Sequence, residues 1–283
     1  MPDFVRIFEM GPRDGLQNEA VMIATADKVA LVDRLSDCGF DHIEVTSFVS
    51  PKWVPQMADA AEVLAGIKRK AGVAYTALTP NMRGYGAARE AGASEVAIFG
   101  SASEGFSQAN INCSIAESLA RFRPLVAAAL ADGIKVRGYV SCVVECPYDG
   151  AVAPEAVAQV AVDLLEMGCY GISLGDTIGA GRPETVAMML EAVLQRVPAG
   201  KLAGHFHDTN GRAVENIEVS LAAGLRCFDA AIGGLGGCPY APGAAGNVDT
   251  LAVARRIEAL GYETGLDRAR LEEAAIFAKG LVG

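Results

Sequence analysis

The sequence predicts a (β/α)8 TIM barrel of the α/β class, formed by a single domain over residues 1–283. A helical, alanine-rich segment closes on a glycine and is followed by a short apolar strand seven times, and an eighth strand, 5–8, opens the chain. Eight such units in about 250 residues are typical of this barrel. An open doubly wound sheet would allow the same alternation, but no GxGxxG motif follows the first strand.

The strands are expected where apolar and β-branched residues follow a glycine, because glycine is the usual residue at the end of a helix that turns back sharply. The pairs are Gly39 before 42–45, Gly72 before 73–75, Gly92 before 96–99, Gly133 before 136–140, Gly168 before 172–174, Gly200 before 202–204 and Gly224 before 228–232. The intervening helices carry an apolar stripe, as at Leu31 and Leu35 opposite Asp27. After the eighth strand we expect the last barrel helix and one additional C-terminal helix, 266–281.

Composition narrows the classes of function. A formal charge of −10 argues against nucleic-acid binding, although a small anionic substrate needs only local arginines. No run of about 18 apolar residues and no secretory leader is visible, so a cytoplasmic protein without membrane contact is expected. The seven cysteines are scattered without a CxxC motif, which predicts reduced thiols.

Two histidines end the seventh predicted strand. His205 and His207 are spaced i, i+2, so both rings lie on one face of a strand. Two neutral imidazoles converging from a strand end suit a divalent metal. The alternative is a pair of partly buried histidines bonded to backbone carbonyls.

A third ligand is expected across the barrel mouth, after the first strand. Asp14 is the candidate, although an aspartate followed by glycine also forms turns. An oxygen of Asn247, beyond the eighth strand, would complete two nitrogens and two oxygens. Such a set with open positions favours Mg²⁺ or Mn²⁺ over structural zinc. Two histidines and a carboxylate also occur in non-haem iron enzymes, so iron remains open.

Glu44 is a carboxylate within the buried second strand and therefore needs a partner. Arg13, at the end of the adjacent strand, is the expected one. A positioned guanidinium beside a metal stabilises an oxyanion. A purely structural ion pair is the alternative.

Cys238 lies in the glycine-rich loop 233–247 that follows the eighth strand. A thiol on a lid over the mouth serves as a proton donor or nucleophile. In the competing interpretation, 233–237 cradles a phosphate, as loops after the last barrel strands often do.

With these residues assembled, the chain resembles the 3-hydroxy-3-methylglutaryl-CoA lyase family of barrel metallolyases over essentially its whole length. The resemblance rests on five segments, 11–19, 43–50, 174–179, 205–209 and 236–241. It implies metal ligands and catalytic residues at matching positions. The ligands are Asp14, His205, His207 and Asn247, and the catalytic residues are Arg13, Glu44, Cys238 and, near the reacting hydroxyl, Asp176.

The resemblance implies cleavage of (S)-3-hydroxy-3-methylglutaryl-CoA to acetyl-CoA and acetoacetate, in leucine catabolism and ketone-body formation, by a homodimer. A lyase for a longer-branched acyl-CoA thioester, such as 3-hydroxy-3-isohexenylglutaryl-CoA, would keep every catalytic residue. A condensing synthase is less expected because those enzymes usually carry an additional C-terminal region. A metal-stabilised binding module is the weakest alternative, since it has no use for a thiol on a lid.

Overall fold

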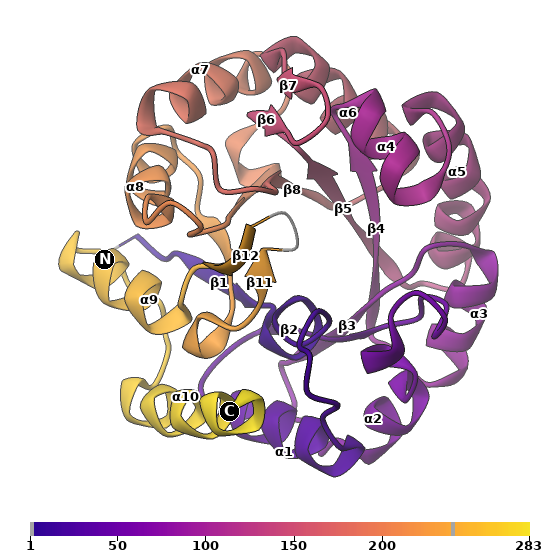
Figure 1. Cartoon of the computed structure of the whole chain (residues 1–283), viewed down its shortest axis with the longest axis vertical. Helices are drawn as coiled ribbons and strands as arrows, with labels where there is room; N and C mark the ends of the chain where they lie inside the picture. Colours follow the sequence, from indigo (N-terminus) through magenta and orange to yellow (C-terminus); the bar gives the residue numbers. More distant parts are fainter. Residues whose placement is uncertain (1–2, 239–240) are drawn as a thin grey trace.

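Eight parallel strands close into a barrel with helices around it (Figure 1). The computed structural model describes residues 3–238 and 241–283, and for 237, 238 and 241–245 it describes the backbone alone. The strand order around the barrel is β1-β10-β9-β8-β5-β4-β3-β2. Their bounds are β1 Arg6–Glu9, β2 His42–Ser47, β3 Ala74–Leu78, β4 Glu95–Ser101, β5 Lys135–Ser141, β8 Gly171–Asp176, β9 Leu202–Phe206 and β10 Cys227–Ala230. The predicted (β/α)8 barrel is confirmed.

Helices alternate with these strands and form the outer layer (Figure 1). They are α1 Thr25–Ser36, α2 Ala60–Gly66, α3 Met82–Glu90, α4 Glu104–Ile111, α5 Ile115–Ala131, α6 Pro154–Met167, α7 Pro183–Leu194, α8 Ala213–Ala222, α9 Thr250–Ala259 and α10 Arg268–Val282. The additional C-terminal helix is confirmed as α10, which lies beside α1, with the Arg34 guanidinium 4.5 Å from the Phe277 ring centre. Within the described chain, we find no helix with the length and apolar character needed to cross a membrane.

The predicted glycines lie at the end of a helix at five of the seven positions, and a sixth, Gly72, lies in the turn before β3. Those six have φ between 73° and 119°, which other residues rarely adopt. The prediction is wrong for Gly72, because α2 ends six residues earlier at Gly66, and for Gly200. Helix α7 already ends at Leu194, and the chain passes Pro198 and the 3-10 turn Ala199–Lys201 before β9 begins. Proline cannot continue a helix, so the reversal is made without a glycine cap.

The apolar core lies between the strands and the helices. Leu31 and Leu35 of α1 are fully buried in it, as their predicted stripe requires. The lumen of the barrel is different, because Glu44, Arg137 and Asp229 are there, each at most 2% exposed. Buried charges need partners, so the lumen must contain an ordered polar network.

The carboxyl ends of the strands form the mouth of the barrel, and a small hairpin lies over it. The hairpin pairs β11 Gly237–Cys238 with β12 Ala241–Ala245 and is drawn near the centre of Figure 1. At its base, the Gly246 N–H donates to the Gly236 carbonyl at 2.8 Å, and the Asp208 N–H donates to the Gly246 carbonyl at 2.6 Å. The hairpin is therefore fixed to the end of β9, where the predicted histidines lie.

Candidate active site

A cavity of about 330 Å³ opens at the mouth of the barrel. Its lining contains five of the predicted site residues, Arg13, Asp14, His205, His207 and Asn247. The lining also contains the apolar residues Val49, Val54, Leu78, Phe99, Phe106 and Val140. This combination suits a substrate with a charged reacting end and an apolar branch.

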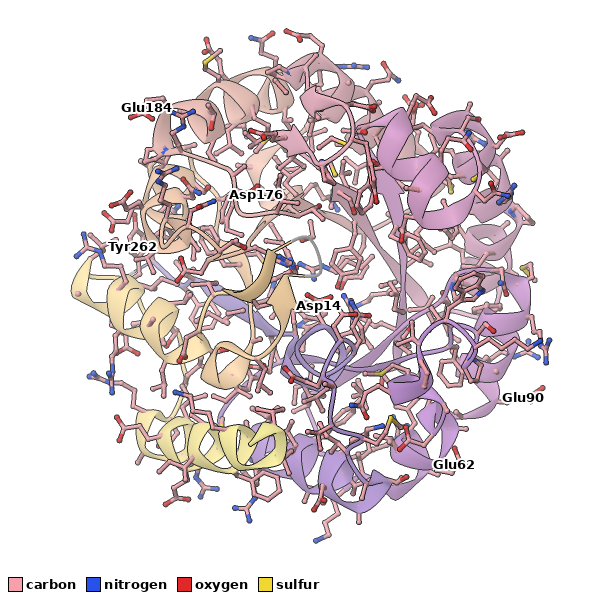
Figure 2. The ribbon with its side chains drawn as sticks, in the orientation of Figure 1. Asp14, Glu62, Glu90, Asp176, Glu184 and Tyr262 are labelled. Atoms are coloured by element: carbon pink, nitrogen blue, oxygen red, sulfur yellow. The ribbon has the colours of Figure 1, made fainter. Side chains whose placement is uncertain are left out.

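Asp14 is presented to the cavity by a π-helical turn, Gly11–Gly15, directly after β1. The Met10 carbonyl accepts the backbone N–H groups of Arg13, Asp14 and Gly15 at 2.8–3.2 Å. Close packing fixes the turn, since a Cβ on Gly15 would lie 2.8 Å from the Leu235 side chain. Asp14 consequently points toward the barrel axis in Figure 2. Such π turns frequently occur at functional sites.

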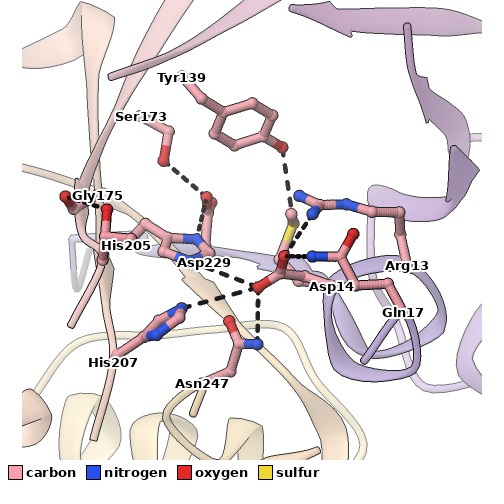
Figure 3. Close-up of polar contacts among 12 residues, drawn as sticks. Arg13, Asp14, Gln17, Tyr139, Ser173, Gly175, His205, His207, Asp229 and Asn247 are labelled. Atoms are coloured by element: carbon pink, nitrogen blue, oxygen red, sulfur yellow. Dashed lines mark hydrogen bonds and ion pairs between the residues drawn. The ribbon is translucent and has the colours of Figure 1, made fainter. Parts of the chain in front are cut away.

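His205 and His207 face Asp14 from the end of β9 (Figure 3). Their Nε2 atoms lie 3.7 Å and 3.8 Å from Asp14 Oδ2, and one potential ligand atom from each of the three residues lies within 4.8 Å of the others. Burial alone would raise the pKa of Asp14, but the charge of Arg13 and the neighbouring imidazoles of His205 and His207 hold it well below its usual range. An ionised carboxylate beside two imidazoles fits a divalent metal ion.

Asn247 is next to this cluster, as predicted, and is 4% exposed. Its backbone forms an isolated bridge with His207, and its amide nitrogen donates to Asp14 Oδ2 at 2.8 Å. Gln17, which the sequence reasoning did not single out, donates to the other oxygen of Asp14 at 3.1 Å.

The predicted contact between Arg13 and Glu44 is confirmed. Arg13 Nε donates to Glu44, and Nη1 donates to Asp14. Tyr139 donates its hydroxyl hydrogen to the second oxygen of Glu44, so that buried carboxylate has two partners. Burial would lower the pKa of Arg13, but the charges of Asp14 and Glu44 raise it. Arg13 is thus a fixed positive charge in the cavity, while its catalytic role stays a prediction.

Asp176 lies at the end of β8 (Figure 2) and is fully buried. Its carboxylate accepts the backbone N–H groups of Ala180 at 3.1 Å and Gly181 at 2.8 Å. Burial raises its pKa. Asp176 is not among the residues that line the cavity, so in this conformation it holds the turn after β8.

Cys238 is described only through its backbone in β11, which pairs with Ala241. Its side chain lies outside the described part of the chain, so its role stays a prediction. The predicted phosphate cradle 233–237 begins in the 3-10 turn Ile232–Gly234. A Cβ on Gly233 would lie 3.3 Å from the Lys279 side chain in α10, so this glycine has a packing role there.

Three further buried charges support the site, and the sequence reasoning missed them. Glu9 accepts the N–H groups of Gly11 and Ile232 and the hydroxyl of Thr250, each at 2.8 Å, and joins the π turn to the chain after β10. Burial raises its pKa to about 7. Arg137 and Asp229 form an ion pair below His205 at 2.6 Å. Arg137 and Asp229 are charged residues inside apolar strands, the same signal that identified Glu44, whereas Glu9 is the last residue of β1.

The fold and the site define a class, a TIM-barrel enzyme with an Asp–His–His cluster at the barrel mouth. The chain matches the HMGL-like family model over residues 4–277 and belongs to the HMGL-like family.

Named relatives agree with this family assignment over nearly the whole chain. The solved HMG-CoA lyase from Brucella melitensis is 62% identical, with a TM-score of 0.98 and 99% of each chain covered. The 3-hydroxy-3-isohexenylglutaryl-CoA/hydroxy-methylglutaryl-CoA lyase of Pseudomonas aeruginosa is 56% identical over 97% of this chain and 91% of its own length. The hydroxymethylglutaryl-CoA lyase of Pseudomonas mevalonii is 53% identical over 99% of this chain and 93% of its own length.

Proposed function

We propose that this chain is a divalent-metal-dependent carbon–carbon lyase that cleaves (S)-3-hydroxy-3-methylglutaryl-CoA to acetyl-CoA and acetoacetate. The observation that carries the proposal is the Asp14–His205–His207 cluster facing Arg13 in one cavity. Relatives named for this activity, at 53% to 62% identity over nearly the full chain, support it.

The proposed reaction moves one proton off the substrate and returns one. The C3 hydroxyl loses its proton, the C2–C3 bond breaks, C3 becomes the ketone of acetoacetate, and C2 becomes the enolate carbon of acetyl-CoA before it is protonated. We propose Asp14, His205, His207 and Asn247 as the ligands of Mg²⁺ or Mn²⁺. Such an ion, when bound, lowers the pKa of a coordinated hydroxyl and orients the substrate.

Arg13 is proposed to stabilise the enolate oxygen as charge develops on it. Glu44 fixes the guanidinium from behind, and Tyr139 fixes Glu44. Because Arg13 is already ordered and buried in its ion pair with Glu44, it needs no rearrangement at the moment of reaction. Cys238, on the hairpin over the mouth, is the proposed donor that protonates the enolate carbon after water has been excluded.

Asp176 stays a proposed base for the C3 hydroxyl, with Asp14 as the alternative. Burial raises its pKa, which is the direction that a general base at neutral pH requires. Its two bonds to the backbone at 180–181 mean that it must be released before it reaches the substrate. Asp14 already faces the cavity.

Four further proposals rest on the sequence reasoning and on relatives. We propose that residues 1–283 work as one domain and that the active form is a homodimer. We also propose a cytoplasmic location, and a role in leucine degradation and ketone-body formation. Relatives are named for both cytoplasmic and mitochondrial forms, so a cell-fractionation experiment is needed for the location.

The direct test incubates the purified protein with (S)-3-hydroxy-3-methylglutaryl-CoA and measures acetyl-CoA and acetoacetate separately. We expect equal amounts of both products, and a higher kcat/KM than for 3-hydroxy-3-isohexenylglutaryl-CoA. The matched control is His207→Ala, which is expected to lose turnover because it removes a ligand of the proposed metal. Absence of both products in the wild-type reaction would refute the proposal, and preference for the longer substrate would favour the alternative acyl chain.

A further inference from the structure

Asp229 is a buried carboxylate beneath the candidate metal site, and the proposed reaction gives it no role. It lies on β10 and is 2% exposed. Its Oδ1 accepts from Arg137 Nη2 at 2.6 Å. Its Oδ2 accepts from Ser173 Oγ at 2.7 Å and from Arg137 Nη1 at 3.2 Å, and it lies 3.1 Å from His205 Nδ1 (Figure 3). Both oxygens are thus committed to neighbouring donors.

We propose that Asp229 is a positioning residue that fixes the ring tautomer of His205, an inference that rests on the proposed metal site. An ionised carboxylate only accepts hydrogen bonds, so Nδ1 of His205 must carry the hydrogen. A neutral imidazole with its hydrogen on Nδ1 has a free electron pair on Nε2. That atom faces Asp14 Oδ2 at 3.7 Å, and it is the atom that would ligate the metal.

Arg137 keeps Asp229 ionised and in one orientation. Arg137 donates to both oxygens of Asp229, from Nη2 at 2.6 Å and from Nη1 at 3.2 Å, so the carboxylate is paired with a buried cation. The guanidinium is itself fixed, because its central carbon lies 4.0 Å from the ring centre of Phe8. Asp229 therefore stays ionised and cannot turn, since one oxygen is held by Arg137 and the other by Ser173.

Replacing Asp229 with asparagine keeps the shape of this side chain but replaces one acceptor oxygen with a donor NH2 group. The shorter bond, from Arg137 Nη2 at 2.6 Å, favours the amide oxygen at the position of Oδ1, because an NH2 group there would place donor against donor at close range. The NH2 group then replaces Oδ2 and gives up only the longer bond from Nη1 at 3.2 Å. The NH2 group must then face His205 Nδ1, which has to become the acceptor. The hydrogen moves to Nε2, and the atom that should bind the metal is blocked.

The experiment measures Mn²⁺ affinity by isothermal titration calorimetry, and the His205 tautomer by ¹⁵N NMR of the metal-free protein. The NMR spectra are recorded at about pH 8, above the ordinary histidine pKa of about 6.5. We expect the wild type to carry the hydrogen on Nδ1. Asp229→Asn is expected to carry it on Nε2 and to bind Mn²⁺ roughly 10- to 100-fold more weakly, the usual effect of losing such a partner.

Two further variants distinguish loss of the positioning of His205 from general damage to the fold. Asp41→Asn is the matched control, because Asp41 Oδ1 lies 2.8 Å from Nδ1 of His42 in the same kind of pair, at the opposite end of the barrel. It should leave Mn²⁺ affinity unchanged. Arg137→Met combined with Asp229→Asn frees the amide to turn its oxygen to His205, so the double variant should bind Mn²⁺ more tightly than Asp229→Asn alone.

The outcomes distinguish this inference from the proposed metal site. If His205→Ala binds Mn²⁺ as tightly as the wild type, the metal site itself is wrong and the inference falls with it. If His205→Ala loses Mn²⁺ but Asp229→Asn does not, only the positioning role is overturned. The His205 tautomer of the wild-type protein can be measured without any variant. A hydrogen on Nε2 of that residue would overturn the inference even if Asp229→Asn failed to fold.

Discussion

Cys238→Ser is expected to fold normally, to bind metal and substrate with ordinary affinity, and to lower kcat roughly 10²- to 10⁴-fold, the usual effect of losing a positioned acid or base. Serine keeps nearly the shape of cysteine. It loses a thiol whose unperturbed pKa, about 8.5, is far closer to working pH than that of a hydroxyl. Steady-state kinetics with the CoA thioester measures the effect.

The matched control for this variant is Cys227→Ser. Cys227 is the first residue of β10 and therefore lies at the end of the barrel opposite the mouth. Burial raises the pKa of its thiol to about 11, so it is poorly suited to proton transfer. We expect a small effect there. Equally small effects from both variants would remove the proton-donor role and restore the alternative in which 233–237 cradles a phosphate.

Arg13→Gln is expected to lower kcat by about 10²-fold or more, with a much smaller change in KM, because its proposed partner acquires charge only during the reaction. Glutamine fills part of the space of arginine and keeps a hydrogen-bond donor, but it cannot supply the fixed positive charge. Glu44 retains the hydroxyl of Tyr139 as a partner, which limits the structural damage. The measurement is kcat and KM separately, alongside a thermal melt.

Arg256→Gln is the control for Arg13→Gln, because it removes an arginine that lies outside the active site. Arg256 binds Glu218 through two hydrogen bonds, at 2.7 Å and 2.8 Å, on the outer helices. Such exposed ion pairs contribute about 0–1 kcal/mol, so kcat should not change. If Arg13→Gln raised KM and left kcat unaltered, Arg13 would be a binding residue and not a catalytic one.

The fold was predictable because its signals are local and repeated. A glycine at φ between 73° and 119° closely follows a helix end five times, and each of these reversals is set by residues adjacent in sequence. Gly200 did not follow the rule, since the residues around Pro198 had already ended the helix. The π turn at Gly11–Gly15 was missed because it depends on packing against Leu235, far away in the sequence.

The site was predictable where a residue type and its place at a strand end pointed to chemistry. His205, His207 and Asp14 meet as expected because the carboxyl ends of barrel strands converge at one mouth. Asp229 was missed because its partners, Arg137 and Ser173, come from two other strands and are visible only in three dimensions. Asp229 is nevertheless a charged residue in an apolar strand, and that feature alone predicts buried partners for it.

The measurement that tests the central claim most directly is turnover of (S)-3-hydroxy-3-methylglutaryl-CoA before and after exhaustive chelation, with circular dichroism to follow the fold. Two nitrogens and two oxygens with open positions predict a metal that is catalytic and not structural. We therefore expect turnover to vanish while the barrel stays folded, and Mg²⁺ or Mn²⁺ to restore it. Full turnover by protein shown to be metal-free would contradict the assignment of Asp14, His205, His207 and Asn247 as ligands.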